Sequence, residues 1–423
     1  MLLVSSMSVP QSLNTTRHCH LPFPMKLRFI LPLLVLPLVL LSCRGDDPAP
    51  AGTAPTPTLT WTFPIQVWGA APSQTPTPSP APPSATLTPT PPPPTATNSP
   101  VPPTSTPAPP VTTLLFTGAI VPGRCVQAAV DAHGNADFLY DDVRGLLTEP
   151  DLTIGILNTA LSDYPPKTGC VKTFVLVGSS NNADAMANAG FDVMNVATNH
   201  IKNCGLTTCG DIAFLDTLDN LNRVGILPVG AGLNLQEAMQ PVVVTVNGIR
   251  FGFVALGEIE PLAFAGPGTP GIAPLPEDFS TADINLTAAI DAASEVSDVV
   301  IAMPHWGSDY SDTPNYRQLH FAEVAVNAGA DLVMGGHPHV LQGMEEINGI
   351  PVFYSPGSFV FDQDWSRETQ QGLVFRVTFS GTQLQTWEAI PVHIDGDGHV
   401  QVAESPEYEE ILNRFNQLSE ALR

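Results

Sequence analysis

Short apolar runs, rich in branched and aromatic residues, recur between residues 111 and 394, and helix-like segments fall between several of them. Because strands that alternate with helices pack as stacked layers, this pattern predicts one α/β domain. Asn247-Gly248 lies between two apolar runs and predicts a hairpin, so antiparallel pairs are expected as well. The predicted strands are TTLLFTGAIV, LTIGILN, FDVMNVA, PVVVTVNGIRFGFVAL, DVVIAMPH, ADLVMGGH, IPVFYSPGSFVF and GLVFRVTF, and the predicted helices cover 182–189, 209–222, 283–296, 316–328 and 406–423.

The chain ahead of this domain has a different composition. Residues 44–110 are dominated by Pro, Thr, Ser and Ala, and no Lys, Arg, Asp or Glu occurs between Asp47 and Arg124. Such a segment cannot bury a hydrophobic core, so it predicts a disordered, Pro-rich linker with polyproline II character. The domain is therefore assigned to 111–394, and residues 395–423 are predicted to add a C-terminal helical extension.

The N-terminal region has the pattern of an export signal. Residues 1–24 carry no clear signal, which makes Met25 the predicted true start. After it, two basic residues precede an apolar run that is too short for an ordinary transmembrane helix. The run ends in Leu-Leu-Ser-Cys43, the form of a bacterial lipobox, so residues 25–43 predict a lipoprotein signal peptide. A plain secretory signal or a short anchor is the alternative.

A lipobox of this kind predicts an extracytoplasmic protein that is anchored in the cell membrane by lipid on Cys43. The formal net charge of −24 argues against nucleic acid as a partner, because a phosphate backbone is bound by Lys and Arg. Acidity of this kind is ordinary for an exported protein that must stay soluble.

Four cysteines lie within the predicted domain, at positions 125, 170, 204 and 209. An even number in an exported chain suggests disulfides, and four cysteines allow three pairings. Proximity in the sequence favours Cys204 with Cys209, which leaves Cys125 with Cys170. Free buried thiols are the alternative, and the absence of a CxxC pair argues against structural zinc.

Histidines stand at the ends of several predicted strands. His305 ends one apolar run in PHWGSDY, and His337 and His339 follow another in GGHPH. Asn199-His200 follows a third, FDVMNVAT. Each motif alone is also compatible with a turn or a loop. Together they predict a metal site, since α/β sheets place their sites at strand ends and neutral imidazoles bind zinc, manganese or iron.

The order of motifs FTGAIVPGR, ILNTAL, VATNHIKNCG, PHWGSDY, GADLVMGGHPHVLQG and YSPGSFVF resembles the CapA family of poly-gamma-glutamate capsule synthesis proteins. This family is related to the calcineurin-like metallophosphoesterases, so the resemblance implies a four-layer αββα sandwich with a metal site at strand ends. It assigns metal-ligand positions to Asn199, His305, His337 and His339, a general-acid position to His200, and the arginine closing the first motif to Arg124.

The sequence departs from the family pattern at acidic positions. Gly118-Ala119 stands where Gly-Asp is usual, Asn158-Thr159-Ala160 where Asn-Leu-Glu is usual, Asn203 where aspartate is usual, and Gly357-Ser358-Phe359 where Gly-Asn-Phe is usual. Two carboxylates expected in or beside the site are thus missing. We expect Ala119 and Ala160 to line one cavity and to leave a gap there.

The remaining ligand set is electrically neutral, and this limits the number of metal ions. Two dications roughly 3.5–4 Å apart need anionic ligands to offset their repulsion. Three histidines suffice for one zinc. We therefore predict one divalent ion, zinc or manganese, and no second. Asp309, Asp362 and Asp364 are the nearby carboxylates available as substitutes.

Two functional hypotheses follow. The chain is either a weakened binding or assembly module for an anionic cell-envelope polymer, or an active metal-dependent hydrolase or transferase acting on such a polymer or on a phosphoester. The intact histidines favour the enzyme, whereas Ala119 and Ala160 favour the weakened module.

Overall fold

The computed structural model describes residues 108–423, apart from residues 168, 203 and 205–208. The predicted start, the signal peptide and the linker up to residue 107 lie outside the described residues.

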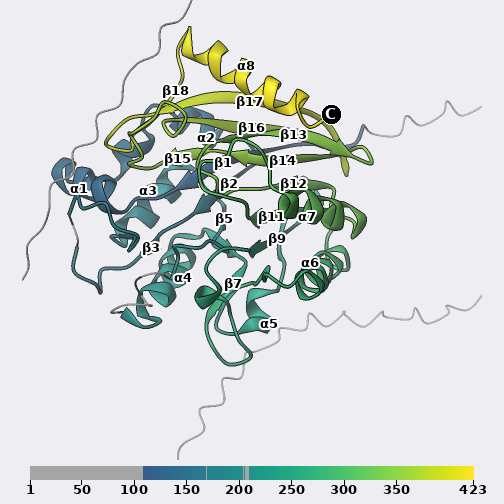
Figure 1. Ribbon diagram of the computed structural model, residues 1–423, viewed down its shortest axis with the longest axis horizontal. Coiled ribbons are helices and arrows are strands. Elements are labelled where there is room, and N and C mark those ends of the chain that lie inside the picture. Colours follow the sequence, from purple (N-terminus) through teal and green to yellow (C-terminus); the bar gives the residue numbers. More distant parts are fainter. Residues whose placement is uncertain (1–107, 168, 203, 205–208) are drawn as a thin grey trace, which may run out of the picture. The chain divides into compact units, whose positions relative to one another are not determined.

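Two large β-sheets form the centre of the described domain (Figure 1). In the larger sheet the strand order is β18-β17-β16-β1-β2-β5-β6, and β15 also pairs with β1; in the smaller sheet it is β13-β14-β12-β11-β9-β8. The larger sheet contains β1 (Val111–Ile120), β2 (Leu152–Leu157), β5 (Val193–Asn195), β6 (Leu227–Val229), β15 (Ser358–Val360), β16 (Gln371–Ser380), β17 (Gln383–Ile394) and β18 (Val400–Val402). The smaller sheet contains β8 (Val242–Val246), β9 (Ile249–Gly257), β11 (Val299–His305), β12 (Leu332–Met334), β13 (Leu341–Ile347) and β14 (Ile350–Pro356).

Two short strand pairs complete the β structure of the described residues: β3 (Ala160–Leu161) with β4 (Val177–Gly178), and β7 (Ala231–Gly232) with β10 (Gly271–Ile272). The helices are α1 (Arg124–His133), α2 (Arg144–Thr148), α3 (Asn181–Ala189), α4 (Ile212–Val224), α5 (Leu235–Ala238), α6 (Phe279–Ser294), α7 (Tyr316–Asn327) and α8 (Glu407–Glu420), with 3-10 turns η1 (Asp137–Tyr140) and η3 (Pro261–Ala263).

The smaller sheet is buried on both faces, and its strands show why. Successive side chains of a strand point to opposite faces. On β9, Phe251 and Phe253 belong to the main core that the sheet shares with the larger sheet, whereas Val254 and Leu256 pack with the apolar faces of α6 and α7. The apolar runs of these strands are therefore nearly continuous, as expected for a sheet covered on both sides.

Helices cover the outer faces of both sheets. Apolar residues of α1, α3 and α4 join the core with the larger sheet, and those of α6 and α7 pack on the smaller sheet. Figure 1 shows α3 and α4 on one side of the domain and α6 and α7 on the other. The arrangement is the four-layer αββα sandwich that the resemblance implied.

The predicted hairpin at Asn247-Gly248 was confirmed. Val246 pairs with Ile249 across Asn247-Gly248, and both turn residues have positive φ, 51° and 82°. This is the backbone that a two-residue hairpin favours and that Asn-Gly tolerates. The predicted helices are all present with ends shifted by a few residues, and α1, α2 and α5 were not predicted.

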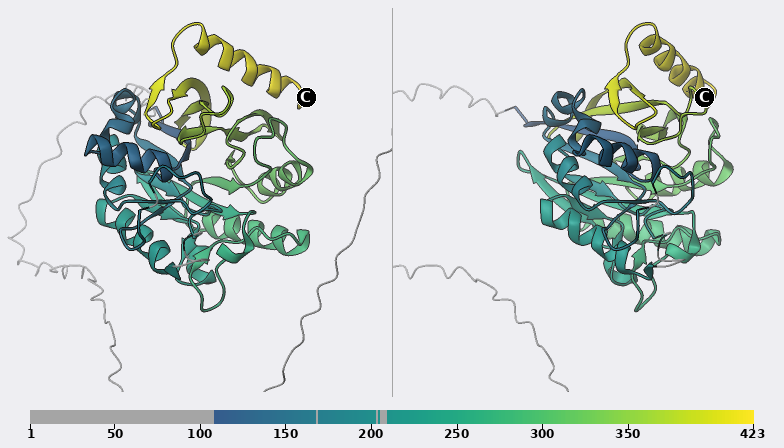
Figure 2. Two further views of the ribbon diagram at one scale, coloured as in Figure 1. Left: turned by 60° about the vertical axis from the view of Figure 1, so that its left-hand side comes forward. Right: turned by 90° about the vertical axis from the view of Figure 1, so that its left-hand side faces the viewer.

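The segment after residue 394 packs on the domain. Strand β18 pairs with β17, and Ile411 and Phe415 of α8 are buried in the main core. In both views of Figure 2, α8, the yellow helix near the C-terminus, lies on the outer side of the strands that precede it in the chain. Within the part of the chain that the structure describes, no helix combines the length and apolar character needed to cross a membrane.

Candidate metal centre

Three histidines meet at the ends of two neighbouring strands of the smaller sheet. His305 is the last residue of β11, and His337 and His339 lie in the loop that follows β12. The two strands run parallel, and a backbone bridge joins His305 to Gly336. The ring centroids of His305 and His337 are 4.9 Å apart, and those of His337 and His339 are 5.7 Å apart. All three side chains are buried. The convergence expected from the sequence is present.

The backbone of this loop is strained at both histidines. His337 has φ 110° and His339 has φ 60°, values that side chains other than glycine rarely adopt. Each such residue costs about 1–3 kcal/mol and persists only where the surrounding structure enforces it. Part of that support is Tyr310, whose backbone N–H donates to the carbonyl of Pro338 over 2.8 Å. Strain of this kind concentrates at functional sites.

Asn199 reaches the same place from the larger sheet. It follows β5, and its Oδ1 accepts a hydrogen bond from His305 Nε2 over 2.9 Å. The neighbouring His200 donates its backbone N–H to Oδ1 of Asn158, the residue after β2. The candidate centre therefore lies where strand ends of the two sheets come together. Asn203, the third position that departs from the family pattern, is outside the described residues.

The buried imidazoles are neutral at physiological pH. Burial holds the pKa of His305 and that of His339 well below the ordinary histidine value, with further lowering by neighbouring histidines. Burial lowers the pKa of His337 to about 4. The pKa of His200 also falls to about 4, because of burial and then because of nearby His337. Neutral imidazole is the form that binds transition metals.

Two ring nitrogens in this group lack a partner. The Nδ1 atoms of His305 and His337 are buried and have no hydrogen-bond partner among the described residues. Buried polar atoms are normally satisfied, so an orphaned nitrogen needs an explanation. A divalent cation would accept these lone pairs, and the residues present therefore fit a metal ion.

Asp309 supplies a carboxylate to this cluster. Its Oδ1 lies 3.4 Å from His337 Nε2. Asp309, His337 and His339 each offer one ligand atom, and these three atoms lie within 4.8 Å of one another. Partial burial raises the pKa of Asp309, while His200 lowers it. The compact ligand group thus contains one carboxylate and two of the predicted histidines.

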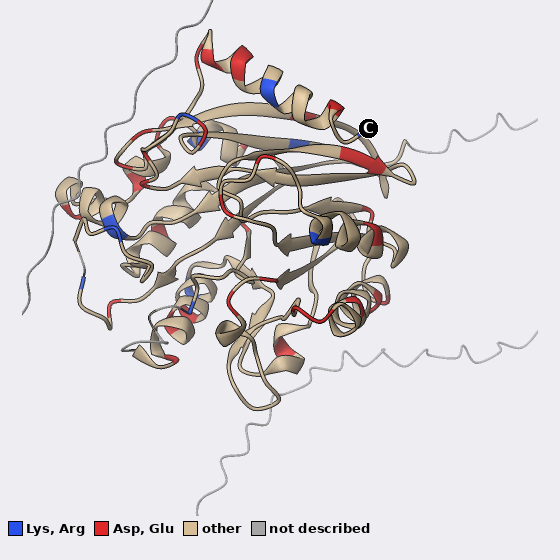
Figure 3. Ribbon diagram, in the orientation of Figure 1, with Lys and Arg blue, Asp and Glu red and all other residues tan. Residues whose placement is uncertain are grey.

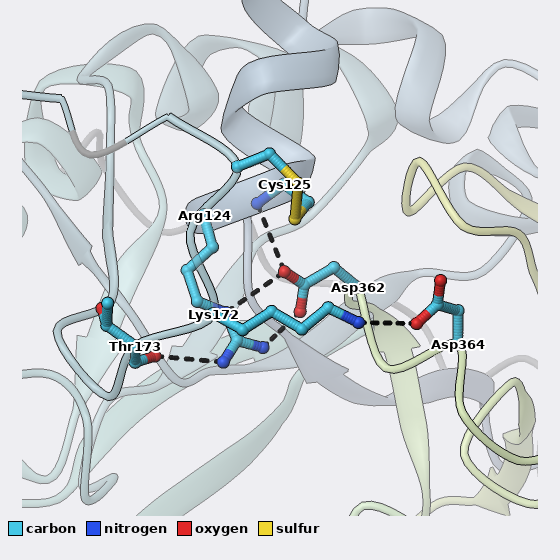
Figure 4. The surroundings of a disulfide bond; sticks show 7 residues. Arg124, Cys125, Lys172, Thr173, Asp362 and Asp364 are labelled. Atoms are coloured by element: carbon cyan, nitrogen blue, oxygen red, sulfur yellow. Dashed lines mark hydrogen bonds and ion pairs between the residues drawn. A yellow bond between two sulfur atoms is a disulfide. The ribbon is translucent and has the colours of Figure 1, made fainter.

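The other two candidate carboxylates are engaged by cations. The Asp362 carboxylate forms a buried, two-point ion pair with the guanidinium of Arg124. Lys172 Nζ lies 2.6 Å from Asp364 Oδ1 (Figure 4). Their negative charges are already offset, so among the three carboxylates only Asp309 lies in the metal-ligand cluster.

Ala119 faces the histidines. It pairs with Ser358 on β15, and directly paired residues project on the same side of a sheet. The Ser358 hydroxyl lies 3.4 Å from His339 Nδ1. A carboxylate at position 119 would therefore point toward the candidate centre.

Ala160 does not share that setting. Its methyl group packs in a separate apolar cluster with Cys204, Cys209 and Ala213. The expectation that Ala119 and Ala160 line one cavity is therefore wrong. Ala160 belongs to the short β3–β4 pair, which bends away after β2 and presents this residue to α4 instead.

Arg124 braces one wall of the site. Besides its pairing with Asp362, its Nη1 donates to the carbonyl of Thr173 over 3.0 Å. The next residue, Cys125, is joined by a disulfide to Cys170 (Figure 4). Cys204 and Cys209 form the second disulfide, so both favoured pairings are present in the structure. The guanidinium donors of Arg124 are largely used by the protein itself, which indicates a positioning role.

Glu258 is a supporting residue that the sequence did not reveal. Its backbone N–H donates to the His305 carbonyl, and its Oε2 accepts from the backbone N–H of Gly307 over 3.1 Å. Its other oxygen pairs with Arg317. Glu258 therefore stabilises the backbone at His305 and in the turn that follows it. The available signal was a pair of glutamates, Glu258 and Glu260, directly after the apolar run IRFGFVALG.

A cavity of about 200 Å³ opens beside the histidine cluster. It brings together predicted site residues, basic residues and aromatic side chains. Its lining consists of Arg124, Lys172, Thr173, Phe174, Leu176, His200, Asp309, Tyr310, His339, Phe361, Gln363 and Trp365.

Comparison with known proteins finds two curated proteins and a solved structure that are similar to this chain. The chain is 30% identical over 288 residues to the PGA biosynthesis protein CapA of Bacillus subtilis, a match that covers 67% of this chain and 72% of that protein. It is 30% identical over 286 residues to the capsule biosynthesis protein CapA of Bacillus anthracis, covering 67% of each. A solved phosphatase from Mycoplasma pneumoniae matches with 12% identity and a TM-score of 0.39, over 72% of this chain and 99% of that one.

Residues 113–363 match the family model described as bacterial capsule synthesis protein PGA_cap. These residues contain every motif on which the resemblance was based and the whole candidate centre. The chain belongs to the bacterial capsule synthesis protein PGA_cap family.

Proposed function

We propose that this chain is an exported accessory protein of capsular or extracellular polymer synthesis, of the poly-gamma-glutamate type. In this role it binds the anionic polymer at a site with a single divalent cation. The observation that carries the proposal is the ligand cluster of Asp309, His337 and His339, which contains one carboxylate. The printed names of two relatives, a PGA and a capsule biosynthesis protein, support the polymer class.

One carboxylate offsets only part of the charge of two dications. A dinuclear hydrolytic centre places its ions roughly 3.5–4 Å apart, where their repulsion is strong in a buried setting. When bound, one zinc or manganese ion supplies positive charge that attracts a carboxylate of the polymer. Asp309, His337 and His339 would hold that ion, with Nδ1 of His305, unpartnered among the described residues, as a further donor and Asn199 bonded to the opposite ring nitrogen of His305.

Bulk electrostatics do not favour an anionic polymer, because acidic residues outnumber basic ones by 40 to 16 (Figure 3). At the cavity, however, Asp362 and Asp364 are paired with Arg124 and Lys172. The positive and negative charges of these four side chains thus offset one another, and a bound cation would make the site attractive to an anionic polymer. This makes polymer binding depend on the metal.

The test is to give the full chain zinc or manganese and to measure its binding to soluble γ-linked polyglutamate. Binding is expected with metal and is expected to be lost in EDTA. A generic phosphodiester, bis(p-nitrophenyl) phosphate, should not be turned over measurably. Metal-dependent turnover that disappears in His337→Ala would instead support the second candidate, an active hydrolase, which the presence of His200 in the same cavity favours.

We also propose that Cys43 anchors the protein in the membrane through lipid. The lipobox supports this proposal, and Cys43 lies outside the described residues. Cys43→Ser should abolish incorporation of labelled palmitate and leave the signal uncut at this position. Cys19→Ser is the control, since it precedes the predicted start and should change nothing. Continued labelling of Cys43→Ser would contradict the anchoring proposal.

A further inference from the structure

Three exposed aromatic side chains, Phe174, Tyr310 and Trp365, line the cavity beside the candidate metal centre and are called the aromatic rim; a fourth, Phe361, is buried. They come from three separate loops and are 80%, 48% and 52% exposed, respectively. Large apolar rings exposed to water are unfavourable, and clusters of them mark binding sites more often than scattered ones do. The rim is therefore a candidate ligand surface.

The rim is held in place by the protein. Tyr310 adopts φ 59°, and its hydroxyl accepts a hydrogen bond from Gln363 Nε2 over 2.9 Å. The ring of Trp365 meets that of Tyr310 edge-on, with centroids 5.6 Å apart. Tyr310 in turn lies 6.3 Å from the ring of His339. A surface fixed before binding loses less freedom when a ligand arrives.

The third ring belongs to a loop that is tied to α1. Phe174 follows Thr173, whose carbonyl is bound by Arg124, and the Cys125–Cys170 disulfide ties the same loop to α1 (Figure 4). The Phe174 ring lies parallel to that of His200, with centroids 6.4 Å apart. Both walls of the rim thus connect directly to residues of the candidate centre.

Polar groups border these rings. Lys172 Nζ lies over one face of the Trp365 ring, 5.3 Å from its centre, and pairs with Asp364. Gln363 also lines the cavity. A pyranose presents a C–H face that packs on an aromatic ring and a periphery of hydroxyls that bond to such polar groups. A linear polyglutamate chain has no comparable flat face, and a nucleobase has fewer hydroxyls for the ammonium and carboxylate to bind.

We infer that the aromatic rim is a sugar-binding subsite, and that its ligand is an anionic sugar, such as a glycosyl phosphate unit of an envelope glycan. The sugar ring packs on Trp365 and Phe174, and its anionic group points to Asp309, His337 and His339 with their cation. The inference rests on the proposed function for the charged half of the site. It adds that this protein also binds a glycan, at the aromatic rim.

The experiment measures binding of glucose 1-phosphate to the metal-loaded full chain by calorimetry. Trp365→Ala and Phe174→Ala should each weaken binding by about fivefold or more, because each removes one stacking surface. Tyr310→Phe keeps the ring but loses the hydrogen bond from Gln363 that helps to fix it, so it should weaken binding less than Trp365→Ala does. Tyr316→Ala removes an exposed aromatic residue away from the cavity and should change nothing. Metal affinity should be unaffected in all four variants.

Glycerol 3-phosphate carries the same head group without a ring, and it should bind more weakly and without sensitivity to Trp365→Ala. The inference is overturned if glucose 1-phosphate does not bind, if both rim variants bind it like the wild type, or if AMP or a γ-glutamate oligomer shows the Trp365 dependence instead. The proposed function is tested by a different measurement. It fails if neither EDTA nor His337→Ala reduces the binding of polyglutamate.

Discussion

Replacing His337 with alanine is expected to lower the affinity of the protein for zinc or manganese by about 100-fold or more. His337 contributes one of three ligand atoms that lie within 4.8 Å of one another. Loss of residues that merely orient a ligand already costs 10–100-fold, and loss of a ligand costs at least as much. The wild type should bind about one ion per chain, measured by calorimetric titration and by metal analysis.

The matched control is His320→Ala. His320 is a partly exposed histidine of α7 that is paired with Asp283 and is not part of the ligand cluster, so its removal should leave metal binding unchanged. Asp309→Asn should have an intermediate effect, because the amide keeps an oxygen ligand and loses the charge. Two tightly bound ions in the wild type, or unchanged affinity in His337→Ala, would contradict the single-ion centre.

A second substitution at His337 separates the effect of backbone strain on stability from the effect of losing a metal ligand. His337 holds φ 110°, which glycine adopts without the cost that a side chain incurs there. His337→Gly removes the same ligand as His337→Ala, so both should lose metal. His337→Gly should nevertheless melt at a higher temperature than His337→Ala. This difference would show that the protein bears strain in order to place the imidazole.

Introducing glutamate at Ala160 is expected to destabilise the domain by about 3 kcal/mol or more. Ala160 is fully buried among Cys204, Cys209 and Ala213, and the carboxylate would have no cationic partner in that cluster. Burial of an unpaired charge is among the few mechanisms that produce effects of this size. Urea unfolding of the variant and the wild type measures the change directly.

Aspartate at Ala119 should behave differently. Its carboxylate would face His339 from the position beside Ser358, so a cation would offset its charge. Ala119→Asp should raise metal affinity, and its loss of stability should shrink when metal is added. Ala160→Ser, which adds a small polar group at the apolar position, should cost far less than Ala160→Glu. Equal stability of Ala160→Glu and the wild type would show that the cluster is not the setting of residue 160.

The sequence alone determined the local structure and the family. Asn247-Gly248 encodes its hairpin through backbone preferences that act within a few residues, and α3, α4, α6, α7 and α8 were predicted from local sequence patterns. The strand-end histidines were also readable, because parallel strands bring their ends to one edge of a sheet. His305 and His337 accordingly meet where the motifs placed them.

Only the tertiary structure decided which charges reach the site. Asp309, Asp362 and Asp364 are equally close to the motifs in sequence, yet Arg124 and Lys172 neutralise the last two and leave Asp309 beside His337. Ala119 and Ala160 both replace acidic residues, yet they face different clusters because β3 leaves the sheet after β2. Ion pairing, and the point at which the chain leaves a sheet, depend on contacts between residues far apart in the chain. No local pattern of residues encodes such contacts.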